Sequence, residues 1–212
     1  MIRLIGLLLL AITSQTLVAM ETFDADTPGV APNHWTTGIT GYGAPIWNLE
    51  RDHTAPSPPL VLKQSGKGDF PWCVKKGSYL ADGFVAVKFK PISGKDDQAA
   101  GLIWRWKDAE NYYVARANAL ENNISIYYVK EGQRKTILYS NLPDHLSVKR
   151  NVWQDFSVDF HGNHFRVNFE GETIIDLKDN HIKTGGAVGL WTKADSITAF
   201  DDFSYGKTEI KK

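Results

Sequence analysis

Apolar and polar residues alternate with a period of two along most of the chain from about residue 83 onward. Neighbouring strand residues point to opposite sides of a sheet, so this alternation predicts strands with one buried and one exposed face. After the first residues, no window sustains the apolar period of 3.6 that a long helix requires. Strands are predicted at residues 84–90, 99–107, 111–118, 123–130, 135–140, 153–160, 164–169, 173–177, 187–192 and 197–205.

The segments between these strands are short and have the composition of turns. "KDAEN", "KEGQ", "HGNH" and "EGE" carry the Gly, Asn and Asp residues that hairpin connections favour. Residues 21–82 are richer in Pro and Gly, and are expected to form edge strands and long loops. Many short strands, each with one apolar face, suit two antiparallel sheets packed face to face. The predicted fold class is therefore an all-β jelly-roll sandwich.

Hairpin parity sorts residues 99–130 into two faces. If "DAEN" is the turn, Trp106 lies opposite Tyr113 and Trp104 lies opposite Ala115, on an apolar face that belongs to the core. A face with guanidinium and amide groups is expected to meet water or a ligand. The residues predicted on that opposite face include Arg105, Arg116, Asn118, Asn123, Ser125 and Tyr127.

A second hairpin, at residues 156–169, has the same two-faced pattern. Phe160 is predicted opposite Phe165 in the core, and Asp159 opposite Arg166 as an exposed ion pair between the strands.

Charge and the N-terminus limit the class of protein. Lys plus Arg number 24 and Asp plus Glu number 24 in 212 residues, so no overall field attracts a nucleic acid. Residues 1–19 show the basic, apolar and polar zones of a signal peptide, with cleavage expected after Ala19 and a retained anchor as the alternative. We therefore expect a single periplasmic or secreted domain at 20–212, monomeric and without a membrane span. Cys73, the one cysteine, excludes a disulfide within the chain and is expected to be buried.

Two long segments carry a family resemblance. "AGLIWRWKDAENYYVARANALENNISIYYVKEGQR" and "GLWTKADSITAFDDF" resemble exported bacterial proteins of the concanavalin A-like lectin/glucanase superfamily. Within it, the similarity is to the 3-keto-disaccharide hydrolase domain, also called a family 16 glycoside hydrolase-like domain. The resemblance implies a concanavalin A-like jelly roll, a location outside the cytoplasm and a relation to carbohydrate. Laminarinase-type family 16 enzymes carry Glu, Asp and Glu on one strand; that pattern is absent, so their activity is not expected.

The two segments also suggest a site. Arg116 and Asn118 share the polar face, and "LENN" turns the chain directly after them. Arg, Asn and acidic side chains can bind vicinal hydroxyls, while an aromatic ring offers a sugar an apolar surface. The predicted saccharide pocket comprises Arg116, Asn118, Glu121, Asn122, Lys193 and Asp195, with Tyr127 or Trp191 at its wall. In an enzyme, Glu121 and Asp195 are the candidate catalytic carboxylates. Alternatively, Arg116, Glu121, Lys193 and Asp195 form a buried ion network that braces a loop.

Three functions remain open from these residues: a hydrolase or lyase acting on an oxidised or unusual saccharide, a non-catalytic carbohydrate-binding module, and a structural or interaction domain. A saccharide is the expected partner in the first two.

The last predicted strand raises the question of a metal. Parity places Asp201 with Phe203 on the core side and Asp202 with Phe200 on the other side. Jelly rolls commonly bring their terminal strands together, which would put Asp201 near Asp24. Two carboxylates and nearby carbonyls suit a structural calcium ion, while the alternative is that Asp201 accepts hydrogen bonds from loop N–H groups. No other cofactor is expected.

Overall fold

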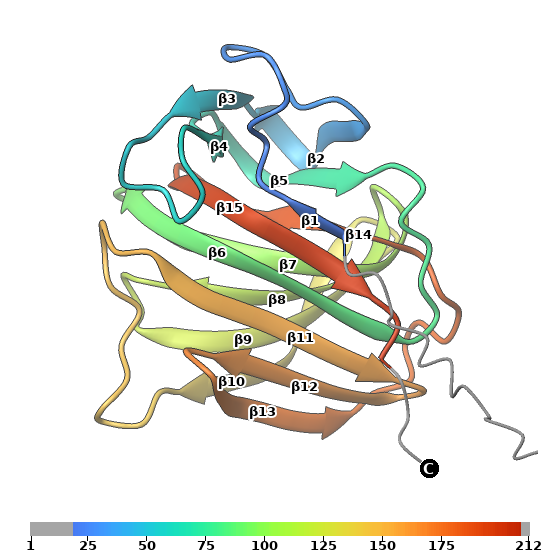
Figure 1. The fold of residues 1–212 in the computed structure, drawn as a ribbon. Helices are drawn as coiled ribbons and strands as arrows, with labels where there is room; N and C mark the ends of the chain where they lie inside the picture. The colour runs from blue at the N-terminus through green and yellow to red at the C-terminus, as the bar shows by residue number, and fades with distance from the viewer. Residues whose placement is uncertain (1–18, 209–212) are drawn as a thin grey trace, which may run out of the picture.

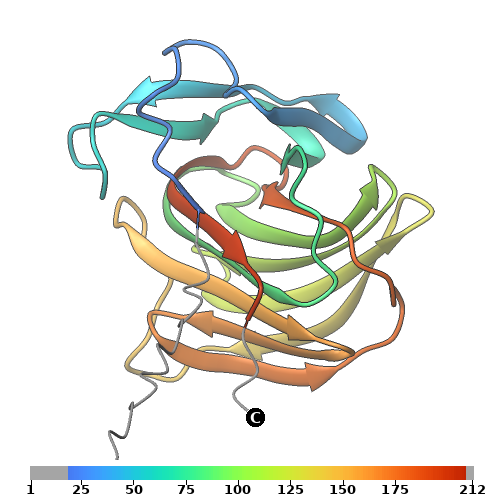
Figure 2. The ribbon, with the colours of Figure 1, turned by 45° about the vertical axis from the view of Figure 1, so that its right-hand side comes forward.

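The computed structural model describes residues 19–208. Their strands form two antiparallel sheets stacked face to face (Figures 1 and 2). Sheet I has the strand order β13-β12-β11-β6-β15-β4-β3, and β1 pairs with β15 beyond the end of β4. Sheet II has the order β10-β9-β8-β7-β14-β5-β2. The predicted all-β sandwich of two antiparallel sheets is confirmed.

The strand bounds follow the alternation of the sequence closely. Sheet I consists of β1 Ala19–Glu21, β3 Trp47–Arg51, β4 Leu60–Gln64, β6 Gly83–Ser93, β11 Gln154–His161, β12 His164–Phe169, β13 Glu172–Lys178 and β15 Ile197–Gly206. Sheet II consists of β2 Trp35–Ala44, β5 Lys67–Lys75, β7 Ala99–Asp108, β8 Asn111–Asn118, β9 Asn123–Lys130, β10 Gln133–Asn141 and β14 Ala187–Trp191. All strands predicted after residue 83 are present. Of the earlier ones, β2 and β3 lie at sheet edges as expected, whereas β4 and β5 lie inside the sheets.

The core lies between the sheets and is rich in aromatic rings. Trp104 of sheet II stacks on Tyr113, with ring centroids 5.2 Å apart, and meets Phe165 of sheet I edge-on at 5.3 Å. Each fully buried side chain of this size stabilises the fold by roughly 1.5–3 kcal/mol. Cys73 is fully buried and belongs to the same core cluster. Across residues 19–208, no helix has the length and apolar character needed to cross a membrane.

A β-bulge changes the predicted register of β7 and β8. At the turn, Asp108 pairs with Asn111 as predicted, but beyond the bulge Trp104 pairs with Tyr113 and not with Ala115, so the predicted register is wrong there by two residues. Arg105 adopts a positive φ of 52°, and its side chain donates to the carbonyl oxygen of Ile182 at 2.8 Å. The bulge shifts Trp106 to the outer face of sheet II, where it joins other aromatic rings. The prediction that Arg105 shares this face with Arg116 was therefore wrong.

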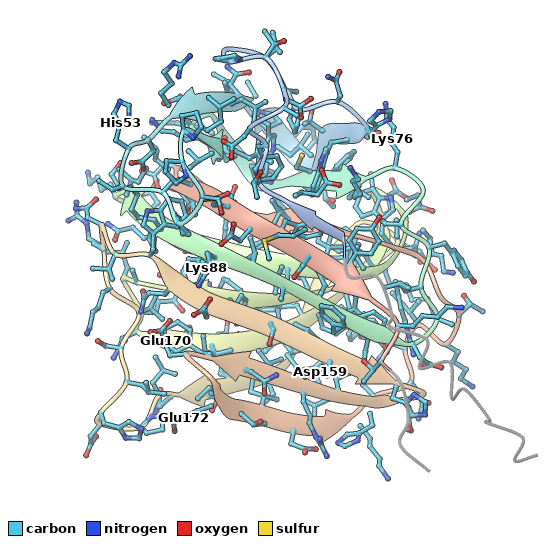
Figure 3. The ribbon with its side chains drawn as sticks, in the orientation of Figure 1. His53, Lys76, Lys88, Asp159, Glu170 and Glu172 are labelled. Carbon is cyan, nitrogen blue, oxygen red and sulfur yellow. The ribbon has the colours of Figure 1, made fainter. Side chains whose placement is uncertain are left out.

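The predicted ion pair on the outer face of sheet I also has a different partner. Asp159 and Arg166 lie opposite each other as expected. However, Arg166 Nε is 3.1 Å from the carboxylate of Asp176 on the next strand, and Asp159 accepts from Asn168 at 2.9 Å. Strand β12 lies between β11 and β13, so Arg166 has a possible partner on each side. Pairing along one hairpin therefore did not determine which carboxylate Arg166 binds. Figure 3 shows Asp159 and Lys88 on this side of sheet I.

The terminal strand β15 contains a second bulge. As predicted, β15 lies beside the N-terminal segment, since Glu21 of β1 pairs with Phe203. Asp202 has a φ of 50°, and both Phe200 and Phe203 are buried in the core. The parity that placed Asp201 with Phe203 was therefore wrong: Asp201 lies on the outer side of sheet I, where its carboxylate meets Ser57 in the loop between β3 and β4. The predicted signal peptide, apart from Ala19, lies outside the described residues.

Candidate functional site

The outer face of sheet II is lined with aromatic side chains that lie flat on the sheet. Trp72 and Trp191 do so because the facing positions on the neighbouring strands are glycines, Gly38 and Gly101. A Cβ atom on Gly38 would come within 2.4 Å of the Trp72 ring, and one on Gly101 within 3.0 Å of the Trp191 ring. The buried residues of this face are Trp72, Val74, Ala99, Ile103, Tyr112, Val114, Tyr127, Val129 and Trp191.

Phe70 and Arg134 form an upper layer on this aromatic face. Phe70 of β5 stacks on Trp191 with ring centroids 5.7 Å apart and planes inclined by 15°. The guanidinium carbon of Arg134, on β10, lies 4.2 Å from the ring centroid of Tyr127 and 4.7 Å from that of Phe70. These two side chains close the face over Trp191, which is fully buried. Tyr139, next to Tyr127, remains 53% exposed.

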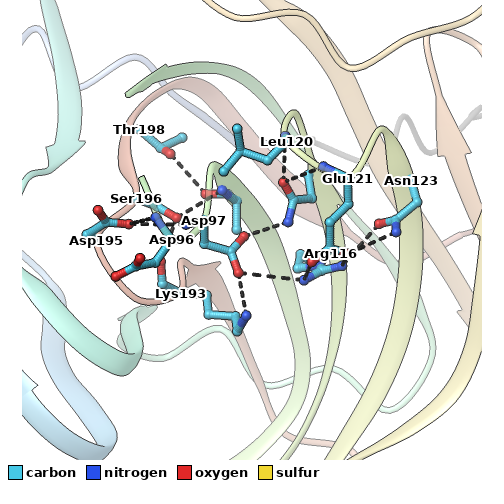
Figure 4. Close-up of polar contacts among 12 residues, drawn as sticks. Asp96, Asp97, Arg116, Leu120, Glu121, Asn123, Lys193, Asp195, Ser196 and Thr198 are labelled. Atoms are coloured by element: carbon cyan, nitrogen blue, oxygen red, sulfur yellow. Dashed lines mark hydrogen bonds and ion pairs between the residues drawn. The ribbon is translucent and has the colours of Figure 1, made fainter. Parts of the chain in front are cut away.

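Asp97 is the centre of a polar network beside this face (Figure 4). Its carboxylate is fully buried and accepts hydrogen bonds from Asn118 Nδ2 at 2.6 Å and from Lys193 Nζ at 2.5 Å. Arg116 Nη1 lies 3.8 Å from the same carboxylate, and Arg116 Nη2 lies 2.5 Å from Glu121. Each of the four charged groups thus has an opposite charge beside it, which limits the cost of burying them.

Asp195 holds the loop that carries Asp97. Its carboxylate oxygens accept backbone N–H groups from Lys95 at 2.8 Å, Asp96 at 3.0 Å and Asp97 at 3.1 Å. The two family-like segments therefore meet through a third segment, "SGKDDQ", that the prediction did not include. The adjacent acids at 96 and 97 were the only available signal, and alternation does not show which of them is buried.

The structure separates the predicted site residues into groups. Asn118, Lys193 and Arg116 lie beside Asp97, and Glu121 pairs with Arg116. Asp195 binds the backbone of the same loop, and Tyr127 and Trp191 belong to the aromatic face. Asn122 does not join them: its side-chain oxygen accepts the backbone N–H of Val148 at 2.9 Å and so holds the loop that precedes β11.

A cavity of about 350 Å³ opens where β5 meets the loop after β14. Its lining includes Lys193 and Asp195 from the predicted set, but not Arg116, Asn118 or Glu121. The complete lining is Lys67, Gly68, Asp69, Phe70, Asp96, Lys193, Ala194 and Asp195. Sequence reasoning missed Phe70, Asp96 and Arg134. Phe70 precedes the region of clear alternation, and nothing in the sequence distinguishes the other two from ordinary exposed charged residues.

Both candidate catalytic carboxylates are stabilised in their ionised form. Burial raises the pKa of Glu121, but hydrogen bonds from Arg116 and Asn123 outweigh this and leave that pKa below its ordinary value. Partial burial likewise raises the pKa of Asp195, and the backbone N–H groups of the 95–97 loop lower it by more. A glycosidase acid needs the opposite shift, so neither group is prepared to donate a proton at neutral pH.

The carboxylates considered for calcium have backbone partners. Asp201 accepts the N–H of Ser57 and that of Asp202, both at 2.8 Å, and Asp24 accepts the N–H of Leu60 at 2.9 Å. Burial, and then the charges of Asp202 and Asp24, raise the pKa of Asp201 to about 6. Within residues 19–208, no three His, Cys, Asp or Glu side chains form a cluster that could hold a metal ion. This geometry matches the loop N–H alternative for Asp201.

Comparison with known proteins gives similarity in structure alone. No family model and no curated protein matches the sequence. Carbohydrate-binding module CBM66 from Bacillus subtilis is similar at a TM-score of 0.64 and 18% identity, covering 82% of this chain and 95% of that chain. The cellulose-induced protein Cip1 is similar at a TM-score of 0.63 and 13% identity, covering 91% of this chain and 98% of that chain. The Bacillus licheniformis beta-glucanase is similar at a TM-score of 0.58 and 11% identity, covering 93% of this chain and 100% of that chain.

At these low identities the similarity concerns the fold. It confirms the concanavalin A-like jelly roll that the sequence predicted. The narrower resemblance to the 3-keto-disaccharide hydrolase group stays a prediction.

Proposed function

We propose that the protein binds a saccharide in the cavity at Phe70, Lys193 and Asp195 and across the adjoining aromatic face of sheet II. The observation that carries this proposal is the composition of the cavity, which joins an aromatic ring to converging charged groups. Its volume of about 350 Å³ lies in the range of small-ligand sites. The carbohydrate-related names of several proteins with this fold support the proposal but do not extend to a particular sugar.

Each kind of lining group has a role in holding a sugar. The Phe70 ring can pack against the apolar C–H face of a pyranose or furanose. The Lys193 ammonium donates hydrogen bonds to hydroxyl oxygens, and the carboxylate of Asp96 accepts them from hydroxyl hydrogens. Lys193 is held in place by Asp97, so less side-chain freedom is lost on binding. Preorganised polar groups beside an aromatic wall are sufficient for a binding module.

Hydrolysis of a keto-disaccharide is the narrower hypothesis, and it rests on the family resemblance. Asp195 lines the cavity and Glu121 lies nearby in the Asp97 network, but both are stabilised as carboxylates. An assay on keto- and ordinary disaccharides compares the parent protein with Asp195→Asn and Glu121→Gln. If either variant keeps sugar binding and loses turnover, the protein is an enzyme; no turnover by the parent leaves it a binding module.

Export to the periplasm or the medium is part of the proposal, because free saccharides and polysaccharides are met there. This part of the proposal rests on the basic, apolar and polar zones of residues 1–19, which are typical of a signal peptide.

A glycan array followed by calorimetric titration tests the binding site. Asp96→Asn removes an exposed charge whose side chain makes no hydrogen bond to the described residues, so the fold should be unaffected while affinity falls. Asp144→Asn is the matched control, since Asp144 is an exposed acid in the loop between β10 and β11. The proposal predicts that Asp96→Asn weakens glycan binding whereas Asp144→Asn does not. Phe70→Ala should weaken binding further, because it removes the aromatic wall. Absence of any bound glycan, which would favour a structural or interaction domain, would overturn it.

A further inference from the structure

We infer that the saccharide carries an acidic group, a carboxylate or a sulfate ester, and that Arg134 binds this group on the outer face of sheet II. The inference rests on the proposed function and specifies the class of saccharide.

Arg134 is partly buried but lacks the counter-charge that the two buried guanidiniums of this protein have. Arg116 is 2.5 Å from the carboxylate of Glu121, and Arg105 is 3.8 Å from that of Asp82. Within residues 19–208, no carboxylate lies within 4.0 Å of the Arg134 guanidinium, and its Nη1 is buried without a hydrogen-bond partner. A partly buried guanidinium without a counter-charge gains from an anion that supplies that charge.

The surroundings hold this guanidinium in place for binding. Its carbon lies 4.2, 4.7 and 5.8 Å from the ring centroids of Tyr127, Phe70 and Trp191, so cation–π contacts fix its position from several sides. A guanidinium fixed among rings loses little freedom when it pairs with a carboxylate or sulfate through two parallel hydrogen bonds. The charge is thus preorganised and uncompensated.

Arg134 also adjoins the proposed sugar cavity. Phe70 lines that cavity and contacts the guanidinium, so a saccharide packed on the cavity side can extend to Arg134. The ring of Tyr139 is exposed and lies 5.8 Å from that of Tyr127, which Arg134 contacts. The Tyr127 hydroxyl and the charges of Arg116 and Arg134 lower the pKa of Tyr139, as expected where the local potential is positive. A saccharide whose ring packs on this aromatic surface and whose acidic group pairs with Arg134 uses both the aromatic surface and the positive charge.

Calorimetric titration with three tetrasaccharide probes tests this assignment: tetragalacturonate for carboxylate, a sulfated galactan fragment for sulfate, and cellotetraose as the neutral reference. We expect one acidic probe to bind more tightly than the neutral one, with affinity that falls as salt is raised. Arg134→Gln should weaken binding of that acidic probe by about ten- to a hundredfold, which is the usual contribution of hydrogen bonds to a charged group. It should leave cellotetraose binding within about twofold, since a neutral sugar does not use the charge.

Lys135→Gln is the matched control, because it removes the same charge from the next residue of β10, whose side chain points to the opposite face. Arg134→Lys keeps the charge without the planar fork and should retain part of the preference, which keeps the test valid if the Gln variant is poorly folded. Equal binding of neutral and acidic probes by the parent, or an acidic preference that survives Arg134→Gln, overturns this inference while saccharide binding stands. Failure of every glycan to bind overturns the proposed function and the inference with it.

Discussion

Replacing Arg116 with Ala distinguishes a network that braces the fold from a group that only holds a ligand. Arg116 is 1% exposed, and its guanidinium lies between the carboxylates of Asp97 and Glu121. The substitution leaves Asp97 fully buried with one cation fewer. Glu121 is affected less, because its side chain is 43% exposed and can be hydrated.

The magnitude follows from these differences in burial. Removing one partner of a buried ion pair costs about 3–5 kcal/mol, because the remaining charge stays out of water. Asp97 keeps Lys193 at 2.5 Å and Asn118 at 2.6 Å, so we expect the lower end, about 3 kcal/mol. In a domain of this size each kcal/mol corresponds to about 2–4 °C in Tm, so the expected loss is about 6–12 °C. A group that only holds a ligand would cost about 1–2 kcal/mol.

Differential scanning calorimetry and urea unfolding measure the effect in parallel with sugar titration. Arg166→Ala is the control, because Arg166 is also ion-paired in a strand but its side chain is 55% exposed. The screened pair of Arg166 should contribute little, so its removal should shift Tm much less. If Arg116→Ala lowers Tm no more than Arg166→Ala, the Asp97 network does not brace the fold and the reasoning from burial fails.

Four further outcomes are expected. Asp201 holds its proton in the folded state up to about pH 6, whereas an unfolded Asp releases it near pH ~4. It therefore contributes stability below about pH 4 that is lost as the pH rises through about 6, by up to ~3 kcal/mol. Urea unfolding at about pH 4 and above about pH 6 gives the free energy of unfolding at both ends of this window, and the parent should lose this stability relative to Asp201→Asn. The same pH dependence in parent and variant would contradict the prediction. Gly38→Ala should destabilise by roughly 1–3 kcal/mol and alter tryptophan fluorescence, since its Cβ would overlap the Trp72 ring; an unchanged Tm would contradict the packing. Added calcium or chelator should leave Tm unchanged if Asp24 and Asp201 serve backbone donors, and a rise with calcium would restore the metal hypothesis. Mass spectrometry of exported protein should find a chain that begins near Met20, and an intact N-terminus there would refute cleavage.

The period-two pattern by itself determined the strands after residue 83 and the class of fold. It also placed Phe160 opposite Phe165 and Asn118 opposite Asn123, as the structure confirms. Alternation reports burial directly, and short turns leave little freedom in the pairing of adjacent strands. Where the chain is rich in Pro and Gly, the pattern is weak, and β5, the strand that carries Phe70 and Trp72, was not assigned.

Tertiary structure decided the details of the candidate site. The bulges at Arg105 and Asp202 moved Trp106, Asp201 and Phe200 to faces that strict alternation does not predict. Asp97 became the centre of the network because β7 lies between β8 and β14, so the loop before β7 meets Asn118 at the end of β8 and Lys193 after β14. Local sequence does not encode these contacts. Burial of a charge depends on what covers it, and the covering residues are distant in sequence. The alternation along each strand therefore predicted the sheets, whereas packing between segments determined which polar side chains meet.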